Sequence, residues 1–184
     1  MTMTHRFDPQ KHHRRSIRLQ GYDYTREGAY YITIVTYQRQ HFFGALVNGE
    51  MRLNEWGRIA RDEWFKTSAL RPYVELYEDE FVVMPNHVHG IVWIENDFVG
   101  AERRSAPTLM KPNVSPKSLG AIIRAYKSAV TYAVNALRSQ RGEVLWQRNY
   151  YEHVIRDHDD YLSKYNYILD NPRNWEADDE NRKR

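Results

Sequence analysis

The pattern of apolar and polar positions predicts alternating strands and helices in the first half of the chain. Residues 29–37 are rich in β-branched and aromatic side chains, which is typical of a strand. Asn54 then caps a helix that runs to about Lys66 and keeps its apolar side chains on one face. Residues 74–83 and 87–94 predict two further strands, separated by a short link.

Two more helices and another strand are predicted in the second half. Ser115, followed by a proline, starts a helix whose apolar residues recur at helical spacing. Residues 150–156 alternate between polar and apolar side chains, as a strand does. A last helix, capped by Asp157 or Asp159, extends to about Asp170, and a proline two residues later stops it.

The order of these elements indicates the fold class. The first six form a βαββαβ unit, which is the ferredoxin-like pattern of an antiparallel sheet with helices on one face. The seventh element is an additional C-terminal helix. We therefore expect an α+β fold with one domain over residues 22–175, in which residues 96–115 form a loop or insertion. A basic N-terminal arm (1–21) and a charged C-terminal tail (176–184) would flank this domain.

Composition narrows the class of protein. The chain has 184 residues, of which 41% are hydrophobic, so one well-packed domain is feasible. It has no cysteine, which excludes disulfides and thiolate-rich zinc sites and fits a reducing compartment. There is no run of about 18 apolar residues to span a membrane, and no apolar core of a secretory signal near the first residues. We therefore expect a soluble, cytoplasmic protein with no membrane partner.

Charge is unevenly distributed along the chain. The net charge is +3, but the segment from Arg103 to Arg148 holds nine lysines and arginines against one acid, Glu143. Such a segment indicates either a polyanionic partner or a solvated helix face. Aromatic side chains among basic ones also suit stacking on single-stranded bases. The candidates for contact with a nucleic acid are Arg124, Lys127, Arg138, Trp146 and Arg148.

Two histidines one residue apart are the first candidate for chemistry. His87 and His89 lie in a predicted strand, so both side chains point to the same face and can bind one divalent ion. The alternative is a pair of partly buried histidines that hydrogen-bond to their neighbours. A histidine triad is excluded, because position 91 is isoleucine. A structural zinc site would need four ligands, to which His153 and His158 could contribute.

The last helix supplies possible partners for the histidines. Tyr167 and Asn171 are four residues apart and therefore share one helical face, on which Lys164 also lies. An amide oxygen can join two histidines around Mg²⁺ or Mn²⁺. If this helix packs across the sheet, a phenol, an amide and a metal converge. The alternative is that these are ordinary packing residues before an Asn-Pro helix stop.

Several of these segments resemble one family of enzymes. The run MPNHVHGIV resembles the H-hydrophobic-H motif of the single-tyrosine HUH transposases, and YILDNP resembles the Y-I-x-x-N-P segment of the REP-associated tyrosine transposases. LWQRNY is similar to the tryptophan-containing strand that precedes the catalytic helix there. RRSIRL and YKSAVT are similar to one branch of the group. In this chain the segments are residues 84–92, 167–172, 145–150, 14–19 and 126–131, and the likeness covers roughly residues 14–175.

This resemblance implies roles for four residues. His87 and His89 would be ligands of Mg²⁺ or Mn²⁺, Asn171 the third ligand and Tyr167 the nucleophile of the C-terminal helix. Members of the family nick and rejoin single-stranded, hairpin-containing DNA through a 5′-phosphotyrosine, and they include monomers and homodimers. The implied protein is a metal-dependent DNA transposase and single-strand endonuclease whose partner is single-stranded or hairpin DNA.

Several alternatives remain at the level of sequence. Tyr150, Tyr151 and Tyr165 are rivals of Tyr167 for the role of nucleophile. The chain could also be a DNA-hairpin binding module with little or no nuclease activity. A third possibility is a metal-dependent phosphodiesterase that uses water.

Overall fold

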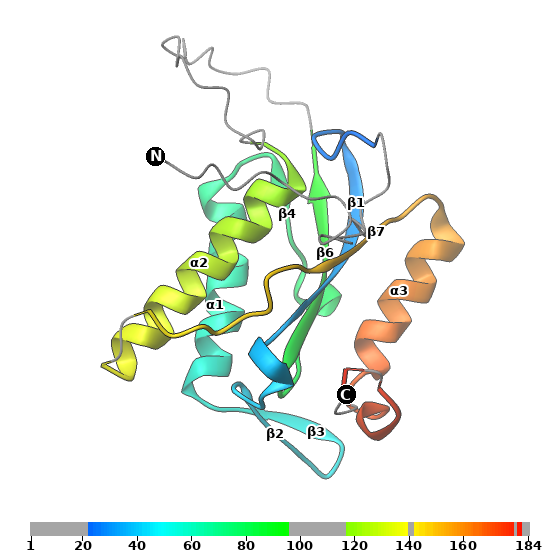
Figure 1. The fold of residues 1–184 in the computed structure, drawn as a ribbon. Coiled ribbons are helices and arrows are strands. Elements are labelled where there is room, and N and C mark those ends of the chain that lie inside the picture. Colours follow the sequence, from blue (N-terminus) through cyan, green and yellow to red (C-terminus); the bar gives the residue numbers. More distant parts are fainter. Residues whose placement is uncertain (1–21, 96–116, 140–141, 179, 182–184) are drawn as a thin grey trace, which may run out of the picture.

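A central sheet organises the chain (Figure 1). A computed structural model describes residues 22–95, 117–139, 142–178 and 180–181. Its strands are β1 (Gly28–Val35), β2 (Gly44–Val47), β3 (Glu50–Leu53), β4 (Val74–Glu75), β5 (Phe81–Val83), β6 (His87–Ile94) and β7 (Tyr151–Val154). Its α-helices are α1 (Glu55–Leu70), α2 (Leu119–Leu137) and α3 (His158–Asp170), and its 3-10 helices are η1 (Tyr37–Arg39), η2 (Glu78–Glu80) and η3 (Trp175–Ala177).

The sheet has the strand order expected of a ferredoxin-like fold. Strands run in the order β4-β6-β1-β7, with β5 also paired to β6, and each of these pairs is antiparallel. Helices α1 and α2 cover one face of this sheet, and α3 lies on the other (Figure 1). The predicted α+β fold with an additional C-terminal helix is therefore confirmed.

The two-residue period of the strands divides their side chains between these layers. Tyr30 and Ile32 of β1 and Val88 of β6 pack in the main core with residues of α1 and α2. Tyr31 and Ile91 point to the opposite face, where they form a smaller buried cluster with Ile168 of α3. His87 and His89 belong to this second set of positions in β6, so they face the layer of α3.

Glycine at position 90 is required by the packing beneath the histidine strand. A Cβ added at Gly90 would lie 2.6 Å from Cζ2 of Trp64 and 2.9 Å from Cδ2 of Phe81. These two rings are stacked with centroids 4.6 Å apart. The absence of a side chain therefore lets Trp64 of α1 approach β6 directly behind His89.

Several predicted boundaries hold. Asn54 caps α1 by accepting a hydrogen bond from Gly57 N, and Asp157 caps α3 in the same way through Asp160 N. Helix α2 begins at Leu119 and is capped by Ser118, three residues after the predicted cap, because Lys117 and Ser118 are not helical. Ser115 itself, the predicted arm (1–21) and the whole of the predicted insertion (96–115) lie outside the described residues. No helix in the described part of the chain has the length and apolar character needed to cross a bilayer.

The strand predicted over residues 74–83 is wrong as a continuous element. It is divided into β4 and β5 by η2, which holds three consecutive acids, Glu78, Asp79 and Glu80. The turn is favoured because it carries the side chain of Glu80 into the protein, where it is 4% exposed, while Glu78 and Asp79 stay at the surface.

The structure also contains a β-hairpin that the sequence pattern does not predict. Strands β2 and β3 pair on either side of a turn at Asn48 and Gly49. Asn48 and Gly49 have φ values of 54° and 77°, the positive values that a two-residue hairpin turn requires.

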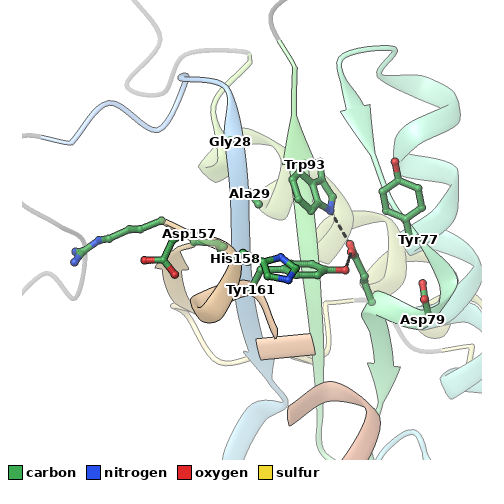
Figure 2. A pocket seen from close by; sticks show the side chains of 11 residues that line it. Gly28, Ala29, Tyr77, Asp79, Trp93, Asp157, His158 and Tyr161 are labelled. Atoms are coloured by element: carbon green, nitrogen blue, oxygen red, sulfur yellow. Dashed lines mark hydrogen bonds between the residues drawn. The ribbon is translucent and has the colours of Figure 1, made fainter. Parts of the chain in front are cut away.

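Glu80 connects α3 to the sheet. One oxygen of its carboxylate accepts a hydrogen bond from Trp93 Nε1 of β6 at 2.7 Å, and the other accepts from the Tyr161 hydroxyl of α3 at 2.7 Å. All three residues line a pocket of about 700 Å³ near the N-terminal end of α3. Figure 2 shows Trp93 and Tyr161 in the lining of this pocket. Tyr165, one turn further along α3, donates to Asp79 at 3.0 Å. The acidic turn therefore anchors the helix that carries Tyr167.

Replacing Glu80 by alanine should destabilise the fold. The substitution leaves the Trp93 and Tyr161 donors without their charged acceptor, so we expect a loss of about 2–4 kcal/mol in the free energy of unfolding, measured by urea denaturation. Glu78→Ala is the matched control. Glu78 belongs to the same turn and makes only an exposed ion pair with Arg61 at 3.7 Å, worth about 0–1 kcal/mol. Equal losses in the two variants would contradict the anchoring role.

Candidate metal centre and tyrosine site

The two histidines form the buried base of the site. His87 is fully buried and His89 is 2% exposed, and their ring centroids lie 4.4 Å apart. Atom Nε2 of each ring is buried and makes no hydrogen bond with the described residues. Buried polar atoms of this kind are rare in native folds. Two of them on adjacent imidazoles indicate a place for a ligand.

Asn86 fixes the tautomer of His87. The Asn86 amide nitrogen donates to the backbone oxygens of Arg39 and Glu180, at 3.3 and 2.9 Å. Its Oδ1 therefore faces Nδ1 of His87, 2.8 Å away, and accepts the proton of that nitrogen. The lone pair of His87 Nε2 is consequently left free, as metal coordination by that atom requires.

Two hydroxyls of β1 hold His89. Its Nδ1 lies 2.7 Å from the Tyr31 hydroxyl and 2.8 Å from Thr33 Oγ1. Thr33 is the direct partner of His89 in the β1–β6 pairing. When Nδ1 carries the proton, it donates a hydrogen bond to one of these oxygens, and the lone pair of Nε2 is then available to a metal ion. Histidines that bind metals typically donate their other ring N–H to a protein oxygen in this way. Sequence reasoning missed Tyr31 and Thr33, because no motif marks them, and it gave no role to Asn86, although this residue lies in the run MPNHVHGIV.

Burial keeps both imidazoles neutral. Desolvation lowers the pKa of His87 to about 4, although the nearby Asp178 carboxylate and Asn171 amide oppose this shift. Desolvation, together with the neighbouring His87, holds the pKa of His89 well below its usual range. Neutral imidazole is the form that binds metal ions, so both histidines are ready for coordination at neutral pH.

Helix α3 brings the predicted tyrosine and asparagine to the histidines. The ring centroid of Tyr167 lies 5.1 Å from that of His89. Asn171 is 1% exposed, and its Oδ1 is a third buried atom without a hydrogen bond to the described residues. Tyr167 itself is 44% exposed, so it stands at the open edge of the site with the histidines beneath it.

The carboxylate of Asp178 links the tyrosine to the asparagine. Its Oδ2 accepts from the Tyr167 hydroxyl at 3.0 Å and from Asn171 Nδ2 at 2.8 Å. Burial, with the charge of Asp178 next to it, raises the pKa of the Tyr167 phenol. The bond from Nδ2 fixes the orientation of the amide and leaves its Oδ1 available.

Asp178 also lies with the two histidines. One potential ligand atom from each of His87, His89 and Asp178 lies within 4.8 Å of the other two, and this is the one such group of histidines and acids among the described residues. We expected residues 176–184 to be a charged tail, but η3 turns the chain back to the site. An acidic segment after a helix stop carries no signal of this return.

Other residues of the C-terminal segment cover the histidines. The ring centroid of Trp175 lies 5.8 Å from that of His87. Glu180 forms an ion pair with Arg39, and its backbone oxygen accepts the bond from Asn86. The fold therefore continues beyond the boundary predicted at residue 175.

The rival tyrosines are placed differently from Tyr167. Tyr165 points to Asp79, on another side of α3. Tyr150 packs against the main core on the opposite face of the sheet. The ring centroid of Tyr151 lies 6.3 Å from that of Tyr31, in an edge-on contact. Among these four tyrosines, Tyr167 is the one whose ring contacts His89.

The histidines considered for a structural zinc site are also separate. Nε2 of His153 lies 2.8 Å from Oδ2 of Asp160, with which it forms an ion pair when protonated. Neither His153 nor His158 belongs to the group formed by His87 and His89 in the described part of the chain.

Only some of the candidates for DNA contact are exposed. Lys127 donates to the backbone oxygen of Gln147 at 2.6 Å, and desolvation lowers its pKa to about 8. Arg138 donates to Asn135 and lies over the ring of Trp56. Trp146 is buried in the main core. Of the five residues, Arg124 and Arg148 are exposed.

The donors that converge here fit a divalent ion. The structure joins two imidazole nitrogens and one amide oxygen, all three buried and without hydrogen bonds to the described residues, next to a carboxylate. Imidazole nitrogens and carboxylate or amide oxygens are both common ligands of divalent ions in proteins. The buried group of His87, His89 and Asp178 could therefore hold a metal ion.

The low pKa of His87 predicts a pH dependence of stability in metal-free protein. Between pH 6.5 and 4 the unfolded chain binds a proton at this position and the folded chain does not, so stability falls as pH falls. In His87→Gln the unfolding free energy should depend less steeply on pH, by up to about 1.4 kcal/mol per pH unit. The measurement is urea denaturation in EDTA from pH 6.5 to 4.5. His158→Gln, at an exposed position, is the control and should keep the wild-type slope. An unchanged slope in His87→Gln would contradict the lowered pKa of His87.

Comparison with known proteins agrees with this fold. An uncharacterized protein of Haemophilus influenzae is 39% identical over 183 residues, which are 96% of this chain and 97% of that protein. No protein-family model matches the chain. The solved structure of a REP-associated tyrosine transposase bound to a REP hairpin is similar, with a TM-score of 0.58 and 20% identity over 86% of this chain and 74% of that one.

A crystal structure of a candidate transposase from Deinococcus radiodurans R1 has a TM-score of 0.44 and 18% identity, over 83% of this chain and 96% of that one. The resemblance noted in the sequence is thus matched in three dimensions by the hairpin-bound structure. The chain belongs to the same family as its Haemophilus influenzae relative and has the fold of a REP-associated tyrosine transposase.

Proposed function

We propose that this protein is a metal-dependent transposase that nicks and rejoins single-stranded DNA. The observation that supports this most directly is the meeting of two segments far apart in sequence. The Y-I-x-x-N-P helix end brings Tyr167 and Asn171 to His87 and His89, next to the ring of His89 and within one buried group of donors. A helix packed only for stability gives no reason for three buried donor atoms that have no hydrogen-bond partner among the described residues.

Hairpin-containing DNA is the proposed substrate. The structural relative was solved with a REP hairpin, and the fold is shared. Arg124 and Arg148 are the exposed cations that we propose for contacts with phosphates. Contacts within the fold occupy the side chains of Lys127, Arg138 and Trp146. We therefore propose that these three residues stabilise the packing of α2 and do not contact DNA.

His87, His89 and Asn171 would hold the ion, Mg²⁺ or Mn²⁺. When bound, the ion would polarise the scissile phosphate and offset the charge that develops on its oxygens. Asn86, Tyr31 and Thr33 keep the two imidazoles in the orientation and tautomer for this task. Because these groups are preset by the fold, little reorganisation is needed at the moment of reaction.

Tyr167 would be the nucleophile. Its oxygen forms a bond to phosphorus while the bond from phosphorus to the 3′ oxygen breaks, which gives a 5′-phosphotyrosine and a free 3′-hydroxyl. The phenol gives up its proton and the departing 3′ oxygen gains one. Attack by another 3′-hydroxyl reverses these steps, so the phosphodiester is conserved without ATP. This balance suits strand transfer rather than hydrolysis.

A covalent adduct is the expected product of incubating the protein with a labelled hairpin oligonucleotide and Mn²⁺. On a denaturing gel, the adduct should appear with wild-type protein and be absent with Tyr167→Phe or when EDTA removes the metal. Tyr165→Phe is the matched control, because it removes a hydroxyl from the same helix that points to Asp79 instead of the histidines. That variant should retain the adduct.

The other outcomes of this experiment separate the competing functions. Cleavage of the oligonucleotide without an adduct would indicate a phosphodiesterase that uses water. Binding without cleavage would indicate a DNA-hairpin module. An adduct that persists in Tyr167→Phe and disappears in Tyr165→Phe would identify Tyr165 as the nucleophile and overturn the mechanism.

A further inference from the structure

We propose that Asp178 is a further ligand of the ion and supplies the negative charge of the site. This inference rests on the proposed metal-dependent function, and it concerns a residue outside both sequence motifs. Asp178 is 6% exposed, so its carboxylate is buried. It lies with His87 and His89 in the group whose potential ligand atoms are within 4.8 Å of one another.

Charge is the first argument for this role. Imidazole binds a metal ion in its neutral form and an amide carries no charge, so an ion held by His87, His89 and Asn171 alone would place two positive charges in a buried site without compensation. Burying an unpaired charge is strongly unfavourable. Asp178 is the acid that the described structure places with the histidines, whereas the neighbouring Glu180 is engaged with Arg39.

The hydrogen bonds of Asp178 leave room for an ion. A carboxylate has about four lone-pair positions. Oδ2 accepts two bonds, from Tyr167 and Asn171, while Oδ1 accepts from the backbone nitrogen of Glu180 at 2.6 Å. The bonds from these described residues therefore use three of the four positions.

The backbone around Asp178 presets the position of its carboxylate. Its nitrogen donates to the backbone oxygen of Trp175 at 3.2 Å, which closes the turn of η3, and its own oxygen accepts from the nitrogen of Asn181. Trp175 in turn packs near His41 and His87. A ligand held in this way loses little conformational freedom when an ion binds.

The donor set then consists of two imidazole nitrogens, one amide oxygen and one carboxylate oxygen. Carboxylates are the protein ligands that Mg²⁺ and Mn²⁺ prefer, while softer ions are selected by thiolates, and this chain has no cysteine. The same carboxylate orients Asn171 through Nδ2. Asp178 would thus contact the ion, the amide of Asn171 and the hydroxyl of Tyr167 at the same time.

Calorimetric titration of the full chain with Mn²⁺, without DNA, tests the inference. Asp178→Asn keeps the size of the side chain and removes its charge, and we expect it to weaken Mn²⁺ binding at least about tenfold. Glu176→Gln is the matched control: it makes the same change two residues away, at an exposed position of η3, and should bind Mn²⁺ as wild type does. Binding by Asp178→Asn within twofold of wild type, or no binding by wild type, would overturn the proposal.

A measurement on the wild-type protein covers the case in which Asp178→Asn does not fold. In ¹³C NMR spectra of the side-chain carboxyl groups, saturation with diamagnetic Mg²⁺ should shift the signal of Asp178 and leave that of Glu176 in place. Equal shifts of the two signals, or no shift of Asp178, would overturn the proposal.

The two proposals fail separately. Suppose that Tyr167 forms the DNA adduct but that Asp178→Asn binds Mn²⁺ as tightly as wild type does. This result would overturn only the role of Asp178. Mn²⁺ binding that depends on Asp178 without any adduct would overturn the transposase function and leave the ligand assignment intact.

Discussion

The two-residue period of β6 is the constraint on which the site depends. It sends Val88 into the main core and turns His87 and His89 to the other face, where they are buried beneath α3. A shift of one residue in the pairing of β6 with β1 would exchange these faces and bury imidazoles among aliphatic side chains. The register is held from behind by Gly90, since only a residue without a side chain admits Trp64 there.

Packing of α3 is the second condition, because it supplies the phenol and the amide. The helix is attached near its N-terminal end by Glu80 and in its last turns by Ile168. Polar contacts set the direction of its side chains, so Tyr165 and Tyr167 point to different acids, Asp79 and Asp178. The carboxylates of Asp79, at the surface, and of Asp178, which is buried, thus determine which tyrosine meets the histidines.

The site residues that follow the regular spacing of one strand or one helix could be predicted from the sequence. The site residues that are brought together only by the tertiary fold could not. The alternation of β6 and the four-residue spacing of Tyr167 and Asn171 predicted the two halves of the site. Tyr31 and Asp178 act through contacts with distant segments that no spacing encodes. Asn86 is next to His87, but its amide is oriented by the distant backbone oxygens of Arg39 and Glu180. The same limit applies to Lys127, which the charge pattern makes a candidate for contact with a nucleic acid: in the fold, the loop before β7 supplies three carbonyl oxygens to it.

Synthesis delivers the members of this centre in a fixed order. The strand with both imidazoles is made early, β7 completes the sheet, and only then do α3 and the turn with Asp178 emerge from the ribosome. A nascent chain whose sheet has already closed therefore holds two histidines without their phenol, amide or carboxylate. Chemistry that needs the whole set cannot begin on a partly made chain, so translation itself delays it until the sheet is finished.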